Sequence, residues 1–383
     1  MKTVLLTLGR LPKGLDVARS FAANGWRVVV AEPFGWTLVG ASRSVAASHR
    51  VSAPAAGHAA YLADLARVVT VEDVSLVVPI SEETMHVAHL PGVPVFTGPA
   101  AAVLRAHHKL GFVEWAEELG LDVPESHALG TPEAAALAAR ADFITKPVHA
   151  CSGRGVRFFT AGDAPPDETV ATVLQGRLRG DIISSCAIAR QGRVVGNALY
   201  RGTQFSGSVA IAFERIAHAA AEEWIARFVA GTGWTGFVSF DFIVDGAGRP
   251  SAIECNPRAT SGLHFFETAD IAPAVLEGRP PQFRPERELQ QFYSCLTELR
   301  PGRRGYFARL RRLAGLRDAC WEWRDPWPFV SMIGTSWPII REAGRRGATF
   351  GEVATLDVGW PSASEPLDAA RHAHAAERQD ERR

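Results

Sequence analysis

The chain has 383 residues, of which 47% are hydrophobic and 21% are charged, as in an ordinary soluble globular protein of two or three domains. Lysine plus arginine (41) equals aspartate plus glutamate (41), so the net charge gives no general attraction to nucleic acid or to an anionic membrane. Five scattered cysteines without a Cys-x-x-Cys pair argue against a structural zinc site and a disulfide framework. With no signal peptide or membrane-spanning run, we expect a cytoplasmic protein with no nucleic-acid or membrane partner.

The first 98 residues predict a small doubly wound α/β domain. Apolar strands at Thr3–Leu8 and Arg27–Ala31 enclose an amphipathic helix near Gly14–Asn24, which is a parallel βαβ unit. The same region predicts a helix over His58–Val69 and strands over Leu76–Ile80 and Val93–Thr97. The loop Gly9–Gly14 lacks both Gly-x-Gly-x-x-Gly and Gly-Lys-Ser/Thr, which argues against nicotinamide binding.

Ser81, Glu82 and Glu83 follow the strand Leu76–Ile80, at the carboxyl edge where open α/β sheets bind ligands. The same residues also suit a helix N-cap followed by two acids in the first turn. The sequence leaves both interpretations open.

Two further segments contain lysines, and only the second has a glycine-containing loop beside it. A helical connector over residues 99–123 contains Lys109, and a predicted strand, Phe143–Val148, contains Lys146. A glycine-containing loop follows Lys146, and a strand, Val156–Thr160, comes after it; the loop residues are Ser152, Gly153, Arg154 and Gly155. Glycines let loop N–H groups approach phosphate oxygens, but the segment by itself is equally a hairpin with a flexible turn.

The middle of the chain predicts two more strands as a hairpin, Ile182–Arg190 and Val194–Tyr200. A polar loop containing Arg201 and Gln204 follows, and an alanine-rich helix is expected over Glu214–Gly231.

A second hairpin, Phe237–Val244 and Pro250–Cys255, surrounds a turn-rich Asp-Gly-Ala-Gly-Arg. With a four-residue loop, Asp245 lies opposite Pro250 and Asp241 opposite Glu254, and strand alternation puts Asn256 on the same face. Two carboxylates and an amide oxygen are ligands that Mg²⁺ or Mn²⁺ prefers, and Arg258 follows within reach of an anion. The alternative is a surface hairpin with ordinary polar residues, which fits poorly because the strands are mostly apolar.

Phe-Asp-Phe followed by Glu-Cys-Asn-Pro-Arg resembles the metal-binding hairpin of the ATP-grasp superfamily, and the resemblance extends in order over roughly Lys2–Asp270. It implies an α/β fold with an N-terminal doubly wound pre-ATP-grasp domain (1–98) and a two-lobed ATP-grasp domain (99–275). Within the latter, a connector (99–123) precedes a lid lobe (about 124–180) and a metal-binding lobe (about 181–275). A mostly helical extension would follow.

The resemblance also implies site roles. Asp241, Glu254 and Asn256 would hold Mg²⁺ or Mn²⁺, and Arg258 the substrate carboxylate or acyl phosphate. The ATP phosphates would contact Lys109, Lys146 and the loop of Ser152, Gly153, Arg154 and Gly155, with Lys146 also catalytic. The adenine would meet the strand of Leu174, Gln175 and Gly176, and the ribose would meet Asp181. Family members often have Gln-Glu where this chain has Gln175-Gly176, which removes one acidic contact to adenine.

The implied activity is ATP-dependent activation of a carboxylic acid as an acyl phosphate, which is then joined to an amine with release of ADP and phosphate. A thiol or other acceptor, or nucleotide binding without turnover, is the alternative. The expected partners are small-molecule carboxylates and amines, and the sequence allows a homodimer.

The C-terminal part has a different composition. Leu276–Glu288 reads as a linker, and the extension 276–361 is rich in tryptophan. We expect these tryptophans to pack against the core, with an aromatic ligand platform as the alternative. An arginine-rich stretch, Arg300–Arg317, predicts a solvated helix face, and residues 362–383 predict a disordered tail.

Overall fold

The computed structural model describes residues 1–149, 155–168, 170–206, 209–291, 305–347 and 350–360. Contacts divide the chain into two compact units. The first comprises residues 1–124 and 178–360, and the second, among the described residues, is 125–177.

The first unit begins with a parallel four-stranded sheet in the order β3-β2-β1-β4. Its elements are β1 (Thr3–Leu6), α1 (Pro12–Ala23), β2 (Arg27–Glu32), β3 (Ala47–Arg50), η1 (Pro54–Ala56), α2 (His58–Val71), β4 (Val74–Val78) and α3 (Thr84–Val87). The predicted strand Val93–Thr97 is wrong in extent, because only an isolated parallel bridge joins Val95 to Val77. Strand β3, which alternates half-buried and exposed residues, was not predicted.

The loop after β1 is closed by a buried ion pair. Glu32, at the end of β2, accepts hydrogen bonds from the backbone N–H of Gly9 (3.0 Å) and from Arg10 Nε (2.9 Å). Arg10 also donates to Asp357 (Nη2 to Oδ2, 2.9 Å), just beyond α13, so the C-terminal helices are anchored to this loop. The Glu32 carboxylate is therefore already engaged by the chain itself.

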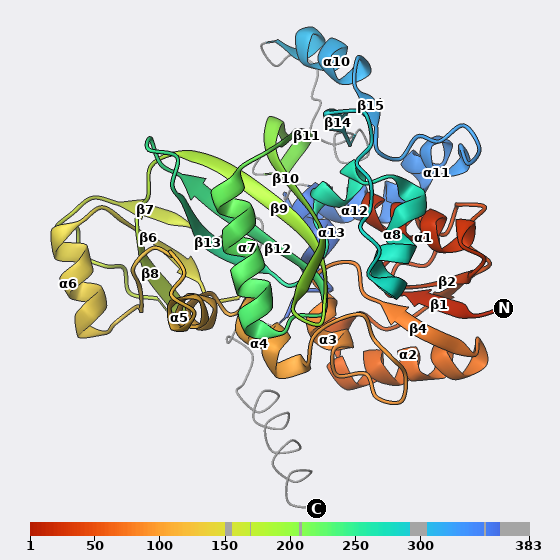
Figure 1. The fold of residues 1–383 in the computed structure, drawn as a ribbon, viewed down its shortest axis with the longest axis horizontal. Coiled ribbons are helices and arrows are strands. Elements are labelled where there is room, and N and C mark those ends of the chain that lie inside the picture. Colours follow the sequence, from red (N-terminus) through yellow and green to blue (C-terminus); the bar gives the residue numbers. More distant parts are fainter. Residues whose placement is uncertain (150–154, 169, 207–208, 292–304, 348–349, 361–383) are drawn as a thin grey trace, which may run out of the picture. The chain divides into compact units, whose positions relative to one another are not determined.

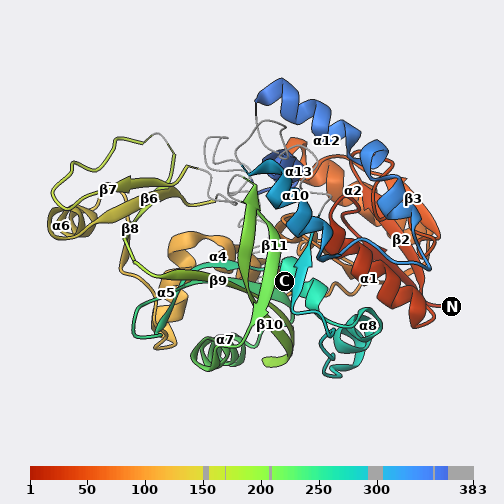
Figure 2. The same ribbon diagram turned by 90° about the horizontal axis from the view of Figure 1, so that it is seen from above.

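The larger sheet of the first unit has the order β13-β12-β9-β10-β11-β14-β15 and is antiparallel except for its last pair (Figure 1). The strands are β9 (Asp181–Arg190), β10 (Arg193–Ser206), β11 (Val209–Ile216), β12 (Gly236–Val244), β13 (Pro250–Asn256), β14 (Glu288–Gln290) and β15 (Arg317–Asp318). Helix α7 (Ala219–Thr232) lies along one face of it (Figures 1 and 2). A two-residue turn, Gln191-Gly192 with both φ angles positive, joins β9 to β10, as a tight hairpin requires.

Two expectations for this sheet are wrong. The predicted helix over Glu214–Gly231 starts later, because Glu214 belongs to β11, which pairs with β10 and β14. Arg201 and Gln204 lie in β10 rather than in a loop. The strand pairing on both sides of β11 outweighs the local helix propensity of its charged end.

Alternation along β12 decides what each face of the sheet carries. Phe240 and Phe242 point toward α7, where Phe240 packs against Trp224 (ring centroids 5.1 Å apart) and Phe228 (5.0 Å). Burying each such ring contributes roughly 2–3 kcal/mol, so the register is strongly fixed. Ser239 and Asp241 must therefore face the opposite side.

The remaining helices of the first unit complete the connector and the C-terminal part. They are α4 (Ala100–His107), α5 (Lys109–Glu118), η2 (Ser261–Phe265), α8 (Thr268–Glu277), α10 (Tyr306–Ala314), α11 (Trp327–Val330), α12 (Met332–Arg346) and α13 (Phe350–Leu356). Helices α1 and α8 lie side by side (Figure 2). Among the described residues, no helix is long and apolar enough to cross a membrane.

The expectation that the C-terminal tryptophans pack against the core is wrong for three of them. Trp323, Trp327 and Trp337 are 81%, 63% and 57% exposed. Trp360 does pack, with its ring 4.8 Å from that of His86. Strands β14 and β15 also join the main sheet, although the sequence indicated few strands here. The predicted arginine-rich face lies partly, and the predicted disordered tail entirely, outside the described residues.

The second unit is an antiparallel sheet in the order β5-β8-β6-β7 with one helix. Its elements are β5 (Ser126–Ala128), α6 (Pro132–Arg140), β6 (Phe143–Pro147), β7 (Arg157–Phe159) and β8 (Thr172–Gly176). The core is small, with Leu137, Phe143 and Leu174 at its centre.

Candidate functional site

The hairpin β12–β13 places Asp241 opposite Glu254, as predicted, but by a different register from the one expected. Val244, not Asp245, lies opposite Pro250. A β-bulge, with Ile253 as the extra residue, then shifts the pairing by one position before Asp241. The bulge thus restores the alignment of the two carboxylates.

Asp241 accepts two side-chain hydrogen bonds and has a like charge beside it. Ser184 Oγ donates to Asp241 Oδ1 (2.5 Å), and Asn256 Nδ2 donates to Oδ2 (3.1 Å). Burial, reinforced by the charge of Glu254, raises the pKa of Asp241 to about 6. A bound cation would relieve both effects, so the donor set of Asp241, Glu254 and Asn256 fits a divalent metal ion of the Mg²⁺ type.

Lys109 forms an ion pair with Glu254. Its Nζ lies 3.4 Å from Glu254 Oε1, and the lysine side chain is almost fully buried. Lys109 is the first residue of α5, whose N-cap, His108, accepts a hydrogen bond from the Gly111 N–H at 3.0 Å. The structure therefore brings together Lys109 and the acidic hairpin, which are 145 residues apart in the sequence.

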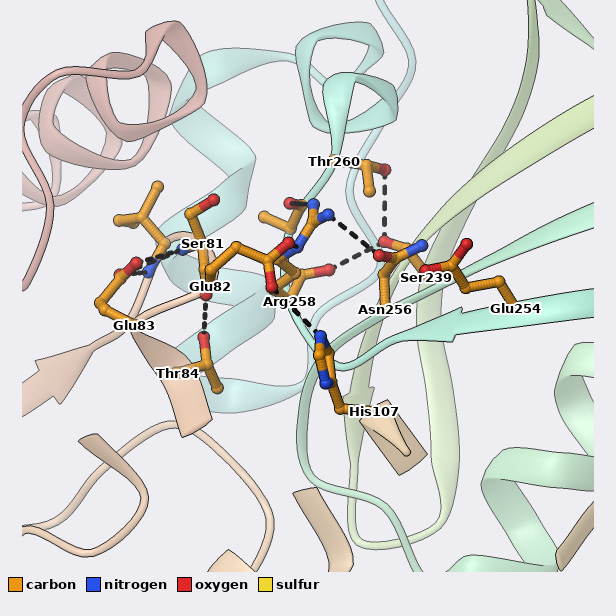
Figure 3. Close-up of polar contacts among 12 residues, drawn as sticks. Ser81, Glu82, Glu83, Thr84, His107, Ser239, Glu254, Asn256, Arg258 and Thr260 are labelled. Carbon is orange, nitrogen blue, oxygen red and sulfur yellow. Dashed lines mark hydrogen bonds and ion pairs between the residues drawn. The ribbon is translucent and has the colours of Figure 1, made fainter. Parts of the chain in front are cut away.

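Arg258 is surrounded by acceptors (Figure 3). Its Nε lies 2.6 Å from Glu82 Oε1, and its Nη2 donates to Asn256 Oδ1 at 2.9 Å. Glu82 Oε2 in turn lies 3.3 Å from His107 Nε2. An incoming substrate anion would therefore have to share the Arg258 guanidinium with Glu82.

Glu82 and Glu83 have different surroundings, although both are buried. Glu83 accepts hydrogen bonds from the backbone N–H groups of Ile80 (2.6 Å) and Ser81 (3.0 Å), so it stabilises the turn before α3. Its side chain does not cap that helix. Glu82 contacts Arg258 instead, so its position agrees with the first interpretation, a residue at the edge of a ligand site. Glu83 stabilises the local backbone and does not act as a helix cap.

Lys13 is a buried cation that the sequence did not single out. Its Nζ donates to the carbonyl oxygen of Ala259 (2.6 Å) and to Ser81 Oγ (3.3 Å). Burial, together with repulsion from Arg258, lowers the pKa of Lys13 to about 7. In the sequence, only its position could have indicated a role for Lys13. It lies where the chain passes from a parallel strand into the next helix, and such positions often line ligand sites.

In the second unit, Lys146 and Gln175 lie on neighbouring strands. Lys146 Nζ donates to Gln175 Oε1 (3.0 Å), and Gln175 Nε2 donates to Ser126 Oγ (2.8 Å). Leu174 points into the small core, and the Gly176 N–H already donates to the carbonyl oxygen of Glu125 (2.9 Å). Strand β8 lies between β5 and β6, and the three residues already have partners within this sheet. Adenine recognition by Leu174, Gln175 and Gly176 stays a prediction.

The remaining predicted residues are only partly described. Gly155 lies in a turn, whereas Ser152, Gly153 and Arg154 fall outside the described residues. Asp181 begins β9, is exposed and pairs with Val244. The preceding residue must be glycine, because a Cβ at Gly180 would lie 2.0 Å from the Val244 carbonyl oxygen.

The fold is thus mixed α/β, and its larger sheet carries a half-buried carboxylate pair, Asp241 and Glu254, beside cationic side chains. Residues 106–262 match the family described as ATP-grasp domain. This segment is therefore an ATP-grasp domain, and the resemblance read from the sequence is confirmed. ATP and Mg²⁺ are the cofactors typical of this kind of domain.

Solved structures agree on the fold at low identity. Pyruvate carboxylase from Rhizobium etli has a TM-score of 0.60 and 15% identity over 75% of this chain and 30% of that one. Biotin carboxylase from Campylobacter jejuni, solved as a β,γ-ATP complex, has a TM-score of 0.58 and 15% identity over 74% of this chain and 72% of that one. L-amino acid ligase from Bacillus licheniformis has a TM-score of 0.56 and 14% identity over 75% of this chain and 78% of that one. This chain therefore spans less than a third of the pyruvate carboxylase. No curated protein matches the sequence.

Proposed function

We propose that this protein is an ATP-dependent ligase that joins a carboxylic acid to an amine. The observation that carries the proposal is the pair Asp241 and Glu254 beside Arg258, within an ATP-grasp domain. Several structural neighbours bear ligase or synthetase names, among them the L-amino acid ligase, which supports the same reaction class.

In the proposed reaction, a carboxylate oxygen of the acid attacks the γ-phosphorus of ATP. The bond from the γ-phosphorus to the β–γ bridging oxygen breaks, which releases ADP and leaves an acyl phosphate. The amine nitrogen then attacks the acyl carbon, loses a proton, and expels phosphate as the carbon–oxygen bond breaks. No protein nucleophile is required.

The side chains have separate proposed tasks. Asp241, Glu254 and Asn256 would hold Mg²⁺, which supplies charge neutralisation at the ATP phosphates. Lys109 and Lys146 would contact phosphate oxygens, and Arg258 would orient the acid carboxylate. Because Glu82 accepts a hydrogen bond from Arg258 Nε, the guanidinium group of Arg258 is already oriented before the substrate arrives.

The test is release of ADP and orthophosphate that depends on both an acid and an amine. Phosphorus NMR of a working reaction identifies the products, with the Glu254→Gln variant as the inactive control. Pyrophosphate in place of orthophosphate would assign the protein to an adenylating class. ATP binding without consumption over a panel of acids would instead indicate a nucleotide-binding protein, and consumption with thiols but not amines would change the acceptor.

A further inference from the structure

Helices α11 and α12 form an almost continuous helical stretch with one exposed apolar stripe (Figures 1 and 2). Only Ser331 separates the two helices, and its backbone is itself helical, with its N–H donating to the carbonyl oxygen of Trp327 (2.8 Å). The exposed apolar side chains along this stretch are Trp327, Val330, Ile333 and Trp337. Their spacings of three, three and four residues put them on one face of the helix.

Trp36, from the turn after β2, widens this stripe. A Cβ added at Gly334 would lie 2.9 Å from Trp36 Cζ3, so the Trp36 ring lies against α12 where the helix has no side chain. The Trp36 side chain is nevertheless exposed. Trp36 and the four residues of the stripe therefore form one surface, which we call the tryptophan patch.

The other face of α12 already packs within the chain. Met332, Ile339 and Ala343 are buried in the same core as Phe350 and Val353 of α13. Helix α12 is therefore held in place by its buried face. The exposed tryptophans are not needed for that packing.

The size of the tryptophan patch matches what a protein interface requires. Each of its five side chains is between 57% and 65% exposed. Since a large aromatic side chain has about 150–250 Å² of surface, the patch exposes on the order of 500 Å². Exposed apolar patches of this size are often functional in proteins. Two such patches facing each other would bury on the order of 1,000 Å², which is near the lower limit for a specific interface.

Arginines continue the stripe toward the end of α12. Arg341 and Arg345 follow Trp337 at four-residue spacings, and both are exposed. Arg345 pairs with Glu342 (3.4 Å), whereas Arg341 forms no ion pair among the described residues. One half of the stripe is thus apolar and the other half cationic. Because guanidinium groups stack favourably on tryptophan rings, each half is a suitable partner for the other.

A second copy of this chain supplies both halves in the required order. In a two-fold symmetric pair with antiparallel α12 helices, the arginines of one copy lie over the tryptophans of its partner. A parallel pair would instead place arginine against arginine. Tryptophan and arginine are also the residues that most often dominate binding at protein interfaces.

We propose that the tryptophan patch is a self-association surface, through which two copies of this chain form a dimer with antiparallel α12 helices. The sequence allowed a homodimer but indicated no surface for it. The inference does not depend on the proposed ligase reaction, because none of these residues belongs to the acidic hairpin.

The test is sedimentation velocity of the full chain, without ATP or metal, at about 1–100 µM. We expect a monomer–dimer equilibrium with a Kd on the order of 10 µM, as for an interface near the lower size limit. Trp337→Ser and Ile333→Ser should each weaken dimerisation at least tenfold. Arg341→Glu should weaken it at least threefold, because the new carboxylate would face the electron-rich side of a tryptophan ring.

The matched control is Val71→Ser. Val71 is the last residue of α2, lies outside the tryptophan patch and is 68% exposed. Its replacement should leave the dimer Kd unchanged, and a loss of dimer as large as that in Trp337→Ser would contradict the proposal.

The substituted side chains are exposed, so the variants should fold; if Trp337→Ser does not, Ile333→Ser decides the outcome. A chain that stays monomeric at about 100 µM, or a Kd unchanged in both variants, would overturn the proposal. A stronger dimer in Arg341→Glu would do the same, because it would indicate a parallel pair. Binding of a monomeric chain to vesicles of phosphatidylcholine and phosphatidylglycerol, lost in Trp337→Ser, would assign the patch to an anionic lipid surface and equally overturn it.

Discussion

Replacing Glu82 by glutamine should destabilise the protein strongly, although the two side chains have nearly the same shape. The Glu82 carboxylate is 2% exposed and contacts Arg258 and His107. Burial opposes ionisation of Glu82, but Arg258, His107 and Lys13 outweigh it and hold the pKa of Glu82 well below its usual range. Glu82 is therefore charged at neutral pH, and the glutamine removes that charge from beside Arg258, whose side chain is 15% exposed.

Removing one member of a buried ion pair costs about 3–5 kcal/mol. For domains of 150–250 residues, each kcal/mol lowers the melting temperature by roughly 2–4 °C, and by less for a larger unit. Because Glu82 lies in the unit of residues 1–124 and 178–360, Glu82→Gln should melt at most about 6–20 °C below the wild type. The matched control is Glu118→Gln, because Glu118 forms an exposed pair with Arg105 (2.6 Å) in the same unit. An exposed pair contributes about 0–1 kcal/mol.

Scanning calorimetry of the three proteins at pH 7 provides the comparison. The reasoning is refuted if Glu82→Gln melts within 2 °C of the wild type, or if Glu118→Gln falls by as much. The pH dependence gives a second check. Since the folded state lowers the pKa of Glu82, its contribution is present above the unfolded value of about 4.5 and is lost on acidification.

Three further predictions concern the metal ligands, the anion contacts and a buried histidine. ADP release should require Mg²⁺ or Mn²⁺ and stop in Glu254→Gln and Asn256→Ala; turnover in the presence of a chelator would contradict this. Arg258→Met should lower kcat by about 10²–10³ with ATP affinity nearly intact, whereas Lys146→Met should weaken ATP binding first. Calorimetric titration of ATP into both variants, together with their turnover rates, measures this contrast. If Arg258→Met abolishes ATP binding, Arg258 is a nucleotide ligand. Burial lowers the pKa of His86 to about 3, so the unfolded chain binds the extra proton between pH 6.5 and 3, and stability should fall by up to about 1.4 kcal/mol per pH unit on acidification. Urea titrations at pH 7 and pH 5 measure this, and His86→Gln should remove most of the difference.

Local periodicity was enough to predict the acidic hairpin. Alternation along β12 puts Phe240 and Phe242 on the buried side under α7, which forces Asp241 to the other face. The strand-helix-strand order of the first residues predicted the parallel sheet for the same reason, because each element repeats its apolar residues within a few positions. The bulge at Ile253 could not be read from such a pattern, since a one-residue shift leaves the composition of the strand unchanged.

Only the tertiary structure decided the surroundings of Arg258. Glu82, His107 and Lys13 come from three separate segments, and 176 residues separate Glu82 from Arg258. No local pattern encodes a contact over that distance, because it depends on how the parallel sheet, the connector and the hairpin pack within one unit. The end of β11 is a similar case: Glu214 has neighbours typical of a helix, but pairing with β10 and β14 makes it a strand residue. The sequence therefore determined which residues share a face, and packing between distant segments determined which charges meet.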